Sequence, residues 1–279
     1  MLKKLSLFGR IDRKESLDVM RAIIGFLEEH GVDVIVEESV SKALGLGEGV
    51  PLSELNEGEA LITVGGDGTI LRALLFVDLP VLPIKIGRIG FLTEVLWNEW
   101  RYALEKLLKG EFTIDERDRL EVQYKSKVFS LTNEVSFKGE KLDKINEFTV
   151  TFSSGGSWNL YCDGIIISTP TGSTGYVLSL GGPIIHPRVR GYIITPIAPY
   201  REPIRSLVLP EDEVIEVRPQ NQGAYVILDG QILITISNKQ KIEIRIDKNR
   251  KTRIIRIRKR GVIEDVFKKI KLENNQGSS

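Results

Sequence analysis

The chain has 279 residues, of which 42% are hydrophobic and 28% are charged, and its formal net charge at pH 7 is +1. It is long enough for two domains, and its charge gives no general reason to expect binding to nucleic acid or to a membrane surface. No apolar stretch reaches the roughly 18 residues of a membrane-spanning helix, and the N-terminus lacks the pattern of a signal peptide. The single cysteine, Cys162, excludes an internal disulfide and fits a reducing cytoplasm.

Strand-like and helix-like segments alternate over the first 115 residues. Apolar runs predict strands at 3–9, 32–37, 60–64 and 81–87, and helical spacing predicts helices over 12–30, 69–76 and 97–108. Asp12 and Glu15 stand three residues apart, so we expect them to form a capping box at the start of the first helix. Alternation of this kind predicts a mostly parallel sheet with helices on both faces.

After residue 116 the pattern changes to short β-rich runs separated by turn residues, which predicts an antiparallel β-sandwich or a related all-β domain. The stretch 239–260 holds eleven basic and two acidic residues and could be a nucleic-acid patch. Its alternating isoleucines favour instead a half-buried hairpin with a solvated basic face. Helical spacing returns at 261–272, which we expect to pack back on the first domain, and the polar tail 273–279 should be disordered.

The sequence therefore predicts an α/β domain over residues 1–115 and a β-sandwich domain over 116–260.

A glycine-rich turn, Gly65-Gly66-Asp67-Gly68, lies between a predicted strand and a predicted helix. Its glycines indicate either positive φ angles or the close approach of another group to the backbone. A strand, such a turn and a helix N-terminus together favour a phosphate, although neither the P-loop motif nor the dinucleotide fingerprint is present. Asp67 could simply cap the helix. Alternatively, it could hold a divalent cation or accept a proton from an attacking hydroxyl, and both of these roles belong to phosphoryl transfer.

Two further stretches carry polar groups suited to a ligand. The loop "TPTGSTGY" (169–176) combines small hydroxyl residues with glycines, which allow close contact with a flat or polyhydroxylated ligand. Asn133 and Glu134 interrupt a strand, and an amide beside a carboxylate can bind the paired hydroxyls of a ribose. Each stretch could equally be an ordinary feature of the surface, the first a turn and the second an exposed strand edge.

Taken together, these motifs resemble those of the NAD kinase family. The Gly-Gly-Asp-Gly turn, the Asn133–Glu134 pair and the segment 163–179 match family motifs in the family's order, as do "GRIGFLTE" (87–94) and "LDGQ" (228–231). The resemblance implies an N-terminal Rossmann-like α/β domain, a C-terminal β-sandwich domain and an active site between them. With a composition rich in Ile, Glu, Lys and Arg, it also indicates a thermophilic, archaeon-like source.

The resemblance further implies phosphoryl transfer from ATP or inorganic polyphosphate to the 2′-hydroxyl of the adenosine ribose of NAD, giving NADP. Asp67 would be the proton acceptor. A divalent cation, with Mg²⁺ expected, would arrive with the phosphoryl donor rather than bind in a dedicated protein cage. The implied assembly is a homo-oligomer, a dimer or a tetramer, with no nucleic acid and no membrane as partner. The residues implied to bind NAD or nucleotide are Gly65, Gly66, Asp67, Gly68, Arg72, Asn133, Glu134, Lys144, Tyr161, Asp163, Thr171, Thr174, Gly175, Tyr176, Val177, Leu178, Ser179, Ala198 and Gln231.

Two other functions stay open. A lipid kinase of the diacylglycerol or sphingoid type would share the glycine-rich turn and both kinds of domain, but the loop 169–176 and the Asn133–Glu134 pair favour a dinucleotide. A non-enzymatic dinucleotide sensor would have no need of Asp67, so the presence of this carboxylate argues against it.

Overall fold

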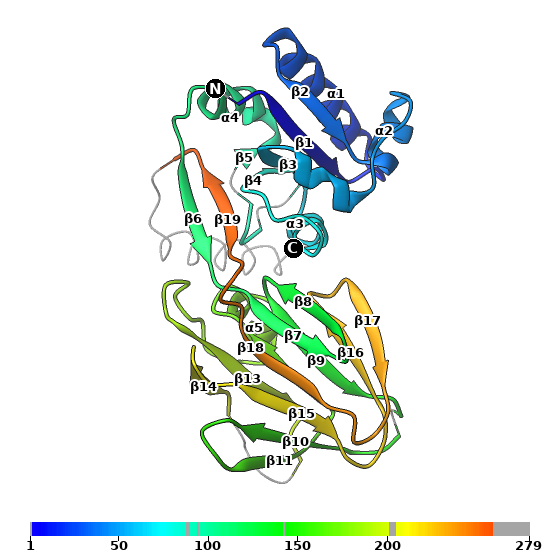
Figure 1. The fold of residues 1–279 in the computed structure, drawn as a ribbon, viewed down its shortest axis with the longest axis vertical. Coiled ribbons are helices and arrows are strands. Elements are labelled where there is room, and N and C mark those ends of the chain that lie inside the picture. Colours follow the sequence, from blue (N-terminus) through cyan, green and yellow to red (C-terminus); the bar gives the residue numbers. More distant parts are fainter. Residues whose placement is uncertain (1, 88–89, 94, 142, 201–204, 259–279) are drawn as a thin grey trace, which may run out of the picture. The chain divides into compact units, whose positions relative to one another are not determined.

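The computed structural model describes residues 2–87, 90–93, 95–141, 143–200 and 205–258, and Figure 1 shows its helices and strands. The described residues form two compact units. The first contains residues 2–116 together with 252–258, and the second contains residues 117–251.

A seven-stranded sheet is the centre of the first unit, in the order β2-β1-β3-β4-β19-β6, with β5 paired to β4. Strands β2, β1, β3 and β4 pair in parallel, as predicted. The strands are β1 (Lys4–Gly9), β2 (Asp33–Val36), β3 (Ala60–Gly65), β4 (Val81–Lys85), β5 (Val95–Leu96), β6 (Thr113–Arg117) and β19 (Thr252–Arg256). The helices are α1 (Lys14–Glu29), α2 (Glu38–Leu44), η1 (Leu52–Glu57), α3 (Asp67–Leu74), η2 (Trp97–Glu99) and α4 (Trp100–Leu108).

Helix α1 is held by its apolar face rather than by a cap. The predicted capping box is wrong, because the helix begins at Lys14 and its N-cap residue, Arg13, makes no side-chain cap. Asp12 instead forms an ion pair with Arg10, with Nη2 and Oδ2 2.5 Å apart. The helix buries a stripe of side chains at helical spacing in the core of the unit, which includes Met20, Ile23, Ile24 and Leu27.

The last strand of the chain corrects the prediction for residues 239–260. The predicted hairpin is wrong, because β18 (Ile242–Ile246) pairs with strands of the second unit while β19 pairs in parallel with β4 at Ile254 and Val81. Alternating isoleucines identify both strands but carry no information on their partners. Residues 252–258 thus belong with the first unit rather than with the predicted domain 116–260, and segments 261–272 and 273–279 lie outside the described residues.

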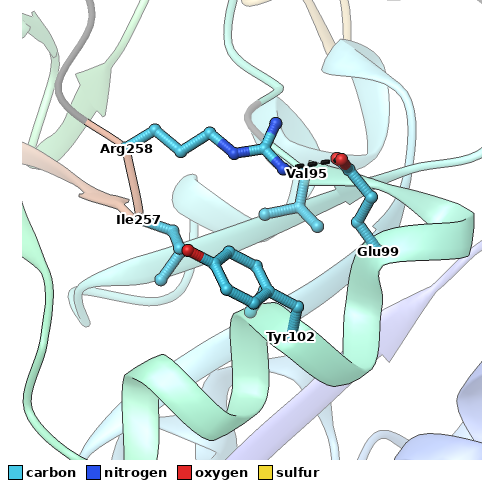
Figure 2. A pocket seen from close by; sticks show the side chains of 6 residues that line it. Val95, Glu99, Tyr102, Ile257 and Arg258 are labelled. Atoms are coloured by element: carbon cyan, nitrogen blue, oxygen red, sulfur yellow. Dashed lines mark hydrogen bonds and ion pairs between the residues drawn. The ribbon is translucent and has the colours of Figure 1, made fainter.

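Beyond β19, Arg258 contacts both η2 and α4 (Figure 2). The Arg258 guanidinium donates a hydrogen bond to Glu99 Oε1 at 2.6 Å, and its Cζ lies 5.8 Å from the centre of the Tyr102 ring. A small pocket is enclosed there by Val95, Glu99, Tyr102, Ala103, Ile257 and Arg258. None of the predicted site residues lines this pocket.

The second unit is the predicted β-sandwich. Its two six-stranded sheets have the orders β11-β10-β15-β18-β7-β8 and β14-β13-β12-β9-β16-β17. Phe137 of the second sheet and Phe148 of the first are fully buried and meet edge to face, with ring centroids 6.4 Å apart, so the sheets share one core. The remaining elements are β7 (Leu120–Tyr124), β8 (Lys127–Leu131), β9 (Glu134–Gly139), β10 (Asn146–Phe152), β11 (Ser157–Cys162), β12 (Gly164–Ser168), η3 (Gly172–Thr174), α5 (Tyr176–Ser179), β13 (Gly191–Ile197), β14 (Leu207–Pro210), β15 (Ile215–Pro219), β16 (Ala224–Leu228) and β17 (Ile232–Ile236).

Among the described residues, no helix is long and apolar enough to cross a membrane.

Candidate functional site

In the first unit, the glycine-rich turn lies at the carboxyl end of the parallel sheet. Strand β1 has β2 on one side and β3 on the other, so the strand order reverses between β1 and β3. Ligands of open α/β sheets bind at such a reversal, outside the carboxyl ends of the strands. The turn follows β3, and Arg10, which follows β1, donates its backbone N–H to Val64 O at 2.9 Å.

The carboxylate of Asp67 faces a neighbouring loop rather than the end of its own helix. Helix α3 begins at Asp67, with Gly66 at the N-cap position, so Asp67 is not the cap. Its oxygens accept hydrogen bonds from the backbone N–H groups of Phe91 at 2.7 Å and Leu92 at 3.3 Å. A Cβ atom at Gly90 would lie 2.1 Å from Asp67 Oδ1, so only glycine allows this approach. Residues 90–92 therefore help to fix the orientation of Asp67.

The glycines before Asp67 serve close packing, since neither Gly65 nor Gly66 has a positive φ angle. A Cβ atom at Gly65 would lie 2.3 Å from Thr69 Oγ1, and one at Gly66 would lie 3.2 Å from Lys85 Nζ. Gly65 and Gly66 are therefore explained by the close approach of other groups and not by positive φ angles. The approaching groups are the side chains of Thr69 and Lys85.

Lys85 is a candidate site residue that lies outside the sequence motifs. Its ammonium group has no hydrogen-bond partner among the described residues, and burial lowers its pKa, with the Asp67 carboxylate opposing this shift and Arg10 adding to it. A lone lysine at the end of the apolar strand β4 was the available signal. Gly68 and Arg72 are also near the turn. They are exposed and stand four residues apart, so they share one face of α3.

In the second unit, the Asn133–Glu134 pair and the loop after β12 lie at the same end of one sheet. Glu134 begins β9 and stands opposite Ser168, the last residue of β12. A Cβ atom at Gly175 would lie 3.5 Å from Glu134 Oε2 and 3.7 Å from Asn133 Nδ2. The structure therefore brings together two stretches that are separated by about forty positions in the sequence.

The residues of that loop have different surroundings. Thr174 donates its hydroxyl to Thr171 O at 3.1 Å, and Lys138 Nζ lies 5.4 Å from the centre of the Tyr176 ring. Val177 is fully buried in a small apolar cluster, which suits an anchor for the loop rather than a ligand contact. Leu178 and Ser179 complete the short helix α5, and Gln231 is exposed in the β16–β17 turn, near the Glu134 end of β9.

The Asn133–Glu134 pair carries buried polar atoms that lack partners. Asn133 Oδ1 and Glu134 Oε2 are buried, and neither accepts a hydrogen bond from the described residues. This excludes the exposed strand edge that the sequence left open. Burial, with the nearby charge of Asp229, raises the pKa of Glu134 to about 8. At neutral pH the protonated Glu134 can donate a hydrogen bond while Asn133 accepts one.

The remaining predicted residues lie away from the pair: Asp163, Lys144 and Ala198 are near the other end of β9, β12 and β13, and Tyr161 is in β11 of the other sheet. Asp163 is exposed just before β12, and its N–H donates to Ile197 O at 2.9 Å. Four residue steps of β12, about 13 Å at about 3.3 Å per step, separate Gly164 from Ser168. Lys144 is exposed between β9 and β10, Ala198 follows β13 with φ of 45°, and the Tyr161 hydroxyl donates to Glu147 Oε1 at 3.2 Å. The structure does not bring these four residues to the Asn133–Glu134 pair.

Within the part of the chain that the structure describes, no three His, Cys, Asp or Glu side chains form a cluster able to hold a metal ion.

Comparison with known proteins covers both units. Residues 5–112 match the model of the ATP-NAD kinase N-terminal domain, and residues 132–257 match that of the ATP-NAD kinase C-terminal domain. An NAD kinase from Thermococcus kodakarensis is 36% identical over 262 residues, which are 91% of this chain and 94% of that protein. An NAD kinase from Caldicellulosiruptor saccharolyticus is 30% identical over 270 residues, which are 96% and 99% of the two chains.

Two solved structures share the fold. The structure of an NAD kinase from Archaeoglobus fulgidus in complex with ATP matches with a TM-score of 0.78 and 26% identity, covering 96% of this chain and 98% of that one. The yeast NADH kinase complexed with NADH matches with a TM-score of 0.88, covering 100% and 89%, and its 22% identity supports likeness of fold alone. From its sequence and fold, the chain belongs to the NAD kinase family.

Proposed function

We propose that the chain transfers a phosphoryl group from ATP to the 2′-hydroxyl of the adenosine ribose of NAD, giving NADP. The observation that carries this proposal is the Asn133–Glu134 pair, whose buried oxygens lack partners beside the glycine-rich loop at Gly175. Buried polar atoms without partners are uncommon in folded proteins and are expected where a ligand completes them. The choice of substrates follows from the relatives. They are named NAD kinase, which supports NAD as acceptor, and one such enzyme was solved in complex with ATP, which supports ATP as donor.

The second unit would bind the dinucleotide. The Asn133 oxygen can accept a hydrogen bond from one ribose hydroxyl, and the protonated Glu134 can donate one to its neighbour. At Gly175 the absence of a side chain leaves the backbone open to close contact with the sugar.

The first unit would supply the proton acceptor. A ribose hydroxyl is a poor nucleophile at neutral pH, so a carboxylate within hydrogen-bond reach assists its attack on the donor phosphate. The hydrogen bonds from Phe91 and Leu92 occupy part of the accepting capacity of Asp67 and leave lone pairs for the hydroxyl proton. Lys85 and Arg10 place positive charge beside the turn, where it can offset the charge of the donor phosphates.

A divalent cation, Mg²⁺ by our proposal, would come to the site with the phosphoryl donor. The donor set fits this arrangement, because Mg²⁺ is commonly held by one or two carboxylates together with substrate phosphates, and Asp67 offers such a carboxylate. When bound, the ion would neutralise charge on the donor oxygens.

We further propose that the protein works in the cytoplasm as a homo-oligomer, without a nucleic-acid or membrane partner. Its single cysteine, Cys162, is buried, which suits a reducing compartment. The edge strand β14 exposes Leu207 and Val208, and a second copy of the chain could cover them.

The proposed function is tested by incubating the purified chain with NAD, Mg²⁺ and ATP and measuring NADP. In one parallel reaction inorganic polyphosphate replaces ATP, which determines the donor. In another, diacylglycerol in mixed micelles replaces NAD. We expect NADP with ATP and no phosphorylated lipid. Phosphorylated lipid together with unchanged NAD would show that the chain is a lipid kinase instead. NAD binding without turnover with either donor would favour a dinucleotide sensor.

A further inference from the structure

Asp229, in the turn after β16, holds the backbone that carries the Asn133–Glu134 pair. Its side chain is 2% exposed. Oδ2 accepts the N–H of Thr132 at 2.8 Å, and Oδ1 accepts those of Asn133 and Glu134 at 2.8 and 2.9 Å. The N–H of Asp229 itself donates to Glu134 O at 2.9 Å. Three consecutive backbone N–H groups thus donate to one carboxylate, which lies in a turn 95 positions beyond Glu134 in the sequence.

The turn geometry alone does not require a carboxylate. Asp229 and Gly230 have φ angles of 46° and 66°, the left-handed pair that Asp-Gly and Asn-Gly sequences favour in hairpins. Asparagine adopts this conformation as readily as aspartate. An amide, however, presents one oxygen and one NH₂ group, and the NH₂ group cannot accept from a backbone N–H. The three amides therefore explain the carboxylate, while the turn explains only the short polar side chain.

The same backbone is fixed from its carbonyl side by Thr169. The Thr169 N–H donates to Asn133 O at 2.8 Å, and its hydroxyl donates to Thr132 O at 2.7 Å. Asp229 thus binds the three N–H groups of segment 132–134 and its last carbonyl, and Thr169 binds the other two carbonyls, so the segment has a fixed orientation. The side chains of Asn133 and Glu134 are thereby directed toward Gly175.

Neighbouring groups stabilise the negative charge of Asp229. Burial raises its pKa to about 6, while the three N–H groups and the guanidinium of the buried Arg119 oppose this shift. At neutral pH the carboxylate is therefore ionised, which is the form that accepts all three hydrogen bonds.

We propose that Asp229 is a positioning residue for NAD binding, because its carboxylate fixes the backbone that aims Asn133 and Glu134 at the substrate. The inference rests on the proposed function, since the pair is taken to bind the ribose of NAD. Asp229 would not touch the substrate and would act through the pair.

The test is a double-mutant cycle on NAD affinity, measured by calorimetry without donor, at a temperature where circular dichroism shows each variant to be folded. We expect Asp229→Asn to weaken NAD binding roughly tenfold, equivalent to the loss of about 1.4 kcal/mol, and to change ATP affinity by less than about twofold. Glu213→Gln is the matched control. It alters a buried carboxylate of the same unit that accepts hydrogen bonds from Ser153 and Ser154 in another turn.

The cycle separates positioning from simple stabilisation. If Asp229 acts through the pair, Asp229→Asn should weaken NAD binding much less in an Asn133→Ala, Glu134→Ala background than in the wild type. Additive effects, or unchanged NAD affinity in folded Asp229→Asn, would overturn the inference. Should that variant not fold, Asp229→Glu enters the same cycle with the same criteria, since it keeps the charge but moves it by one methylene. Wild-type protein that binds no NAD would instead contradict the proposed function.

Discussion

At the scale of single residues, Asp67, which we propose as the catalytic base, is held by contacts with the protein backbone. Its carboxylate orients toward the backbone of Phe91 and Leu92, and only glycine at position 90 leaves room for it. Such support fixes a reactive group before the substrate arrives, which is how enzymes keep a base in productive geometry.

Replacing Asp67 by asparagine tests the assignment of the base. The variant keeps the size of the side chain but loses the proton acceptor, so turnover should fall by about 10²–10⁴. NAD affinity should change little, and the free energy of unfolding should fall by about 1 kcal/mol, because the amide cannot accept both backbone N–H groups. The control is Asp18→Asn, at an exposed position of α1. Near-normal turnover in folded Asp67→Asn protein would remove Asp67 from the mechanism.

Glu134 should make stability depend on pH. Its folded-state pKa of about 8 lies above its ordinary value of 4.5, because burial and Asp229 disfavour the charged form. Its contribution to stability is therefore complete below about pH 4.5 and is lost as the pH rises through about 8. Glu134→Gln, which stays neutral, should gain stability relative to the wild type between pH 5 and 8. Denaturant unfolding of both proteins measures this difference, and a constant gap across the range would contradict it.

Individual site residues differ in how far the sequence reveals them. Asp67 and the Asn133–Glu134 pair could be proposed from motifs, because each lies in a short stretch of unusual composition. Asp229 and Lys85 became candidates only through their contacts with residues distant in the sequence. The backbone N–H of Glu134, for example, is 95 positions from Asp229. Contacts of that kind follow from strand pairing, which local patterns do not specify.

At the scale of elements, β19 joins the end of the described chain to the first sheet. It pairs with β4 at Ile254 and Val81, and Arg256 Nη2 contacts Asp115 Oδ2 at 2.9 Å. Period-two alternation identified β18 and β19 as strands, but their partners depend on strand pairing over long sequence distances, and each strand lies in the interior of a different sheet. The segment 38–44 was missed as a helix because its cap is Glu37, which is not among the usual N-cap residues.

A core substitution in β19 measures how much this strand contributes. Ile254 is fully buried, so Ile254→Ala should lower the free energy of unfolding by about 2–5 kcal/mol. Leu46→Ala, at a side chain that is 48% exposed in the same unit, should cost less than about 1 kcal/mol. Equal losses in the two variants would show that β19 is not part of the core of the first unit.

At the scale of the whole molecule, the two units differ in how the chain builds them. The second unit is one continuous segment, 117–251, with two sheets around its own core, whereas the first needs residues 252–258 as well as 2–116. A fragment of residues 117–251 should therefore unfold cooperatively on heating, while residues 1–116 alone lack β19 and should be much less stable. Calorimetry of both fragments checks this, and a fragment 117–251 without a cooperative transition would contradict it.

The most direct test of the account is the position of the phosphate in the product. The purified chain is incubated with NAD, ATP and Mg²⁺, and the dinucleotide product is examined by ³¹P NMR and by an NADP-specific dehydrogenase. We predict a new phosphomonoester on the 2′-oxygen of the adenosine ribose, formed by the wild type and formed about 10²–10⁴ times more slowly by Asp67→Asn. A phosphate at another hydroxyl, or NAD recovered unchanged while ATP labels a different acceptor, would contradict the assignment of NAD as the substrate.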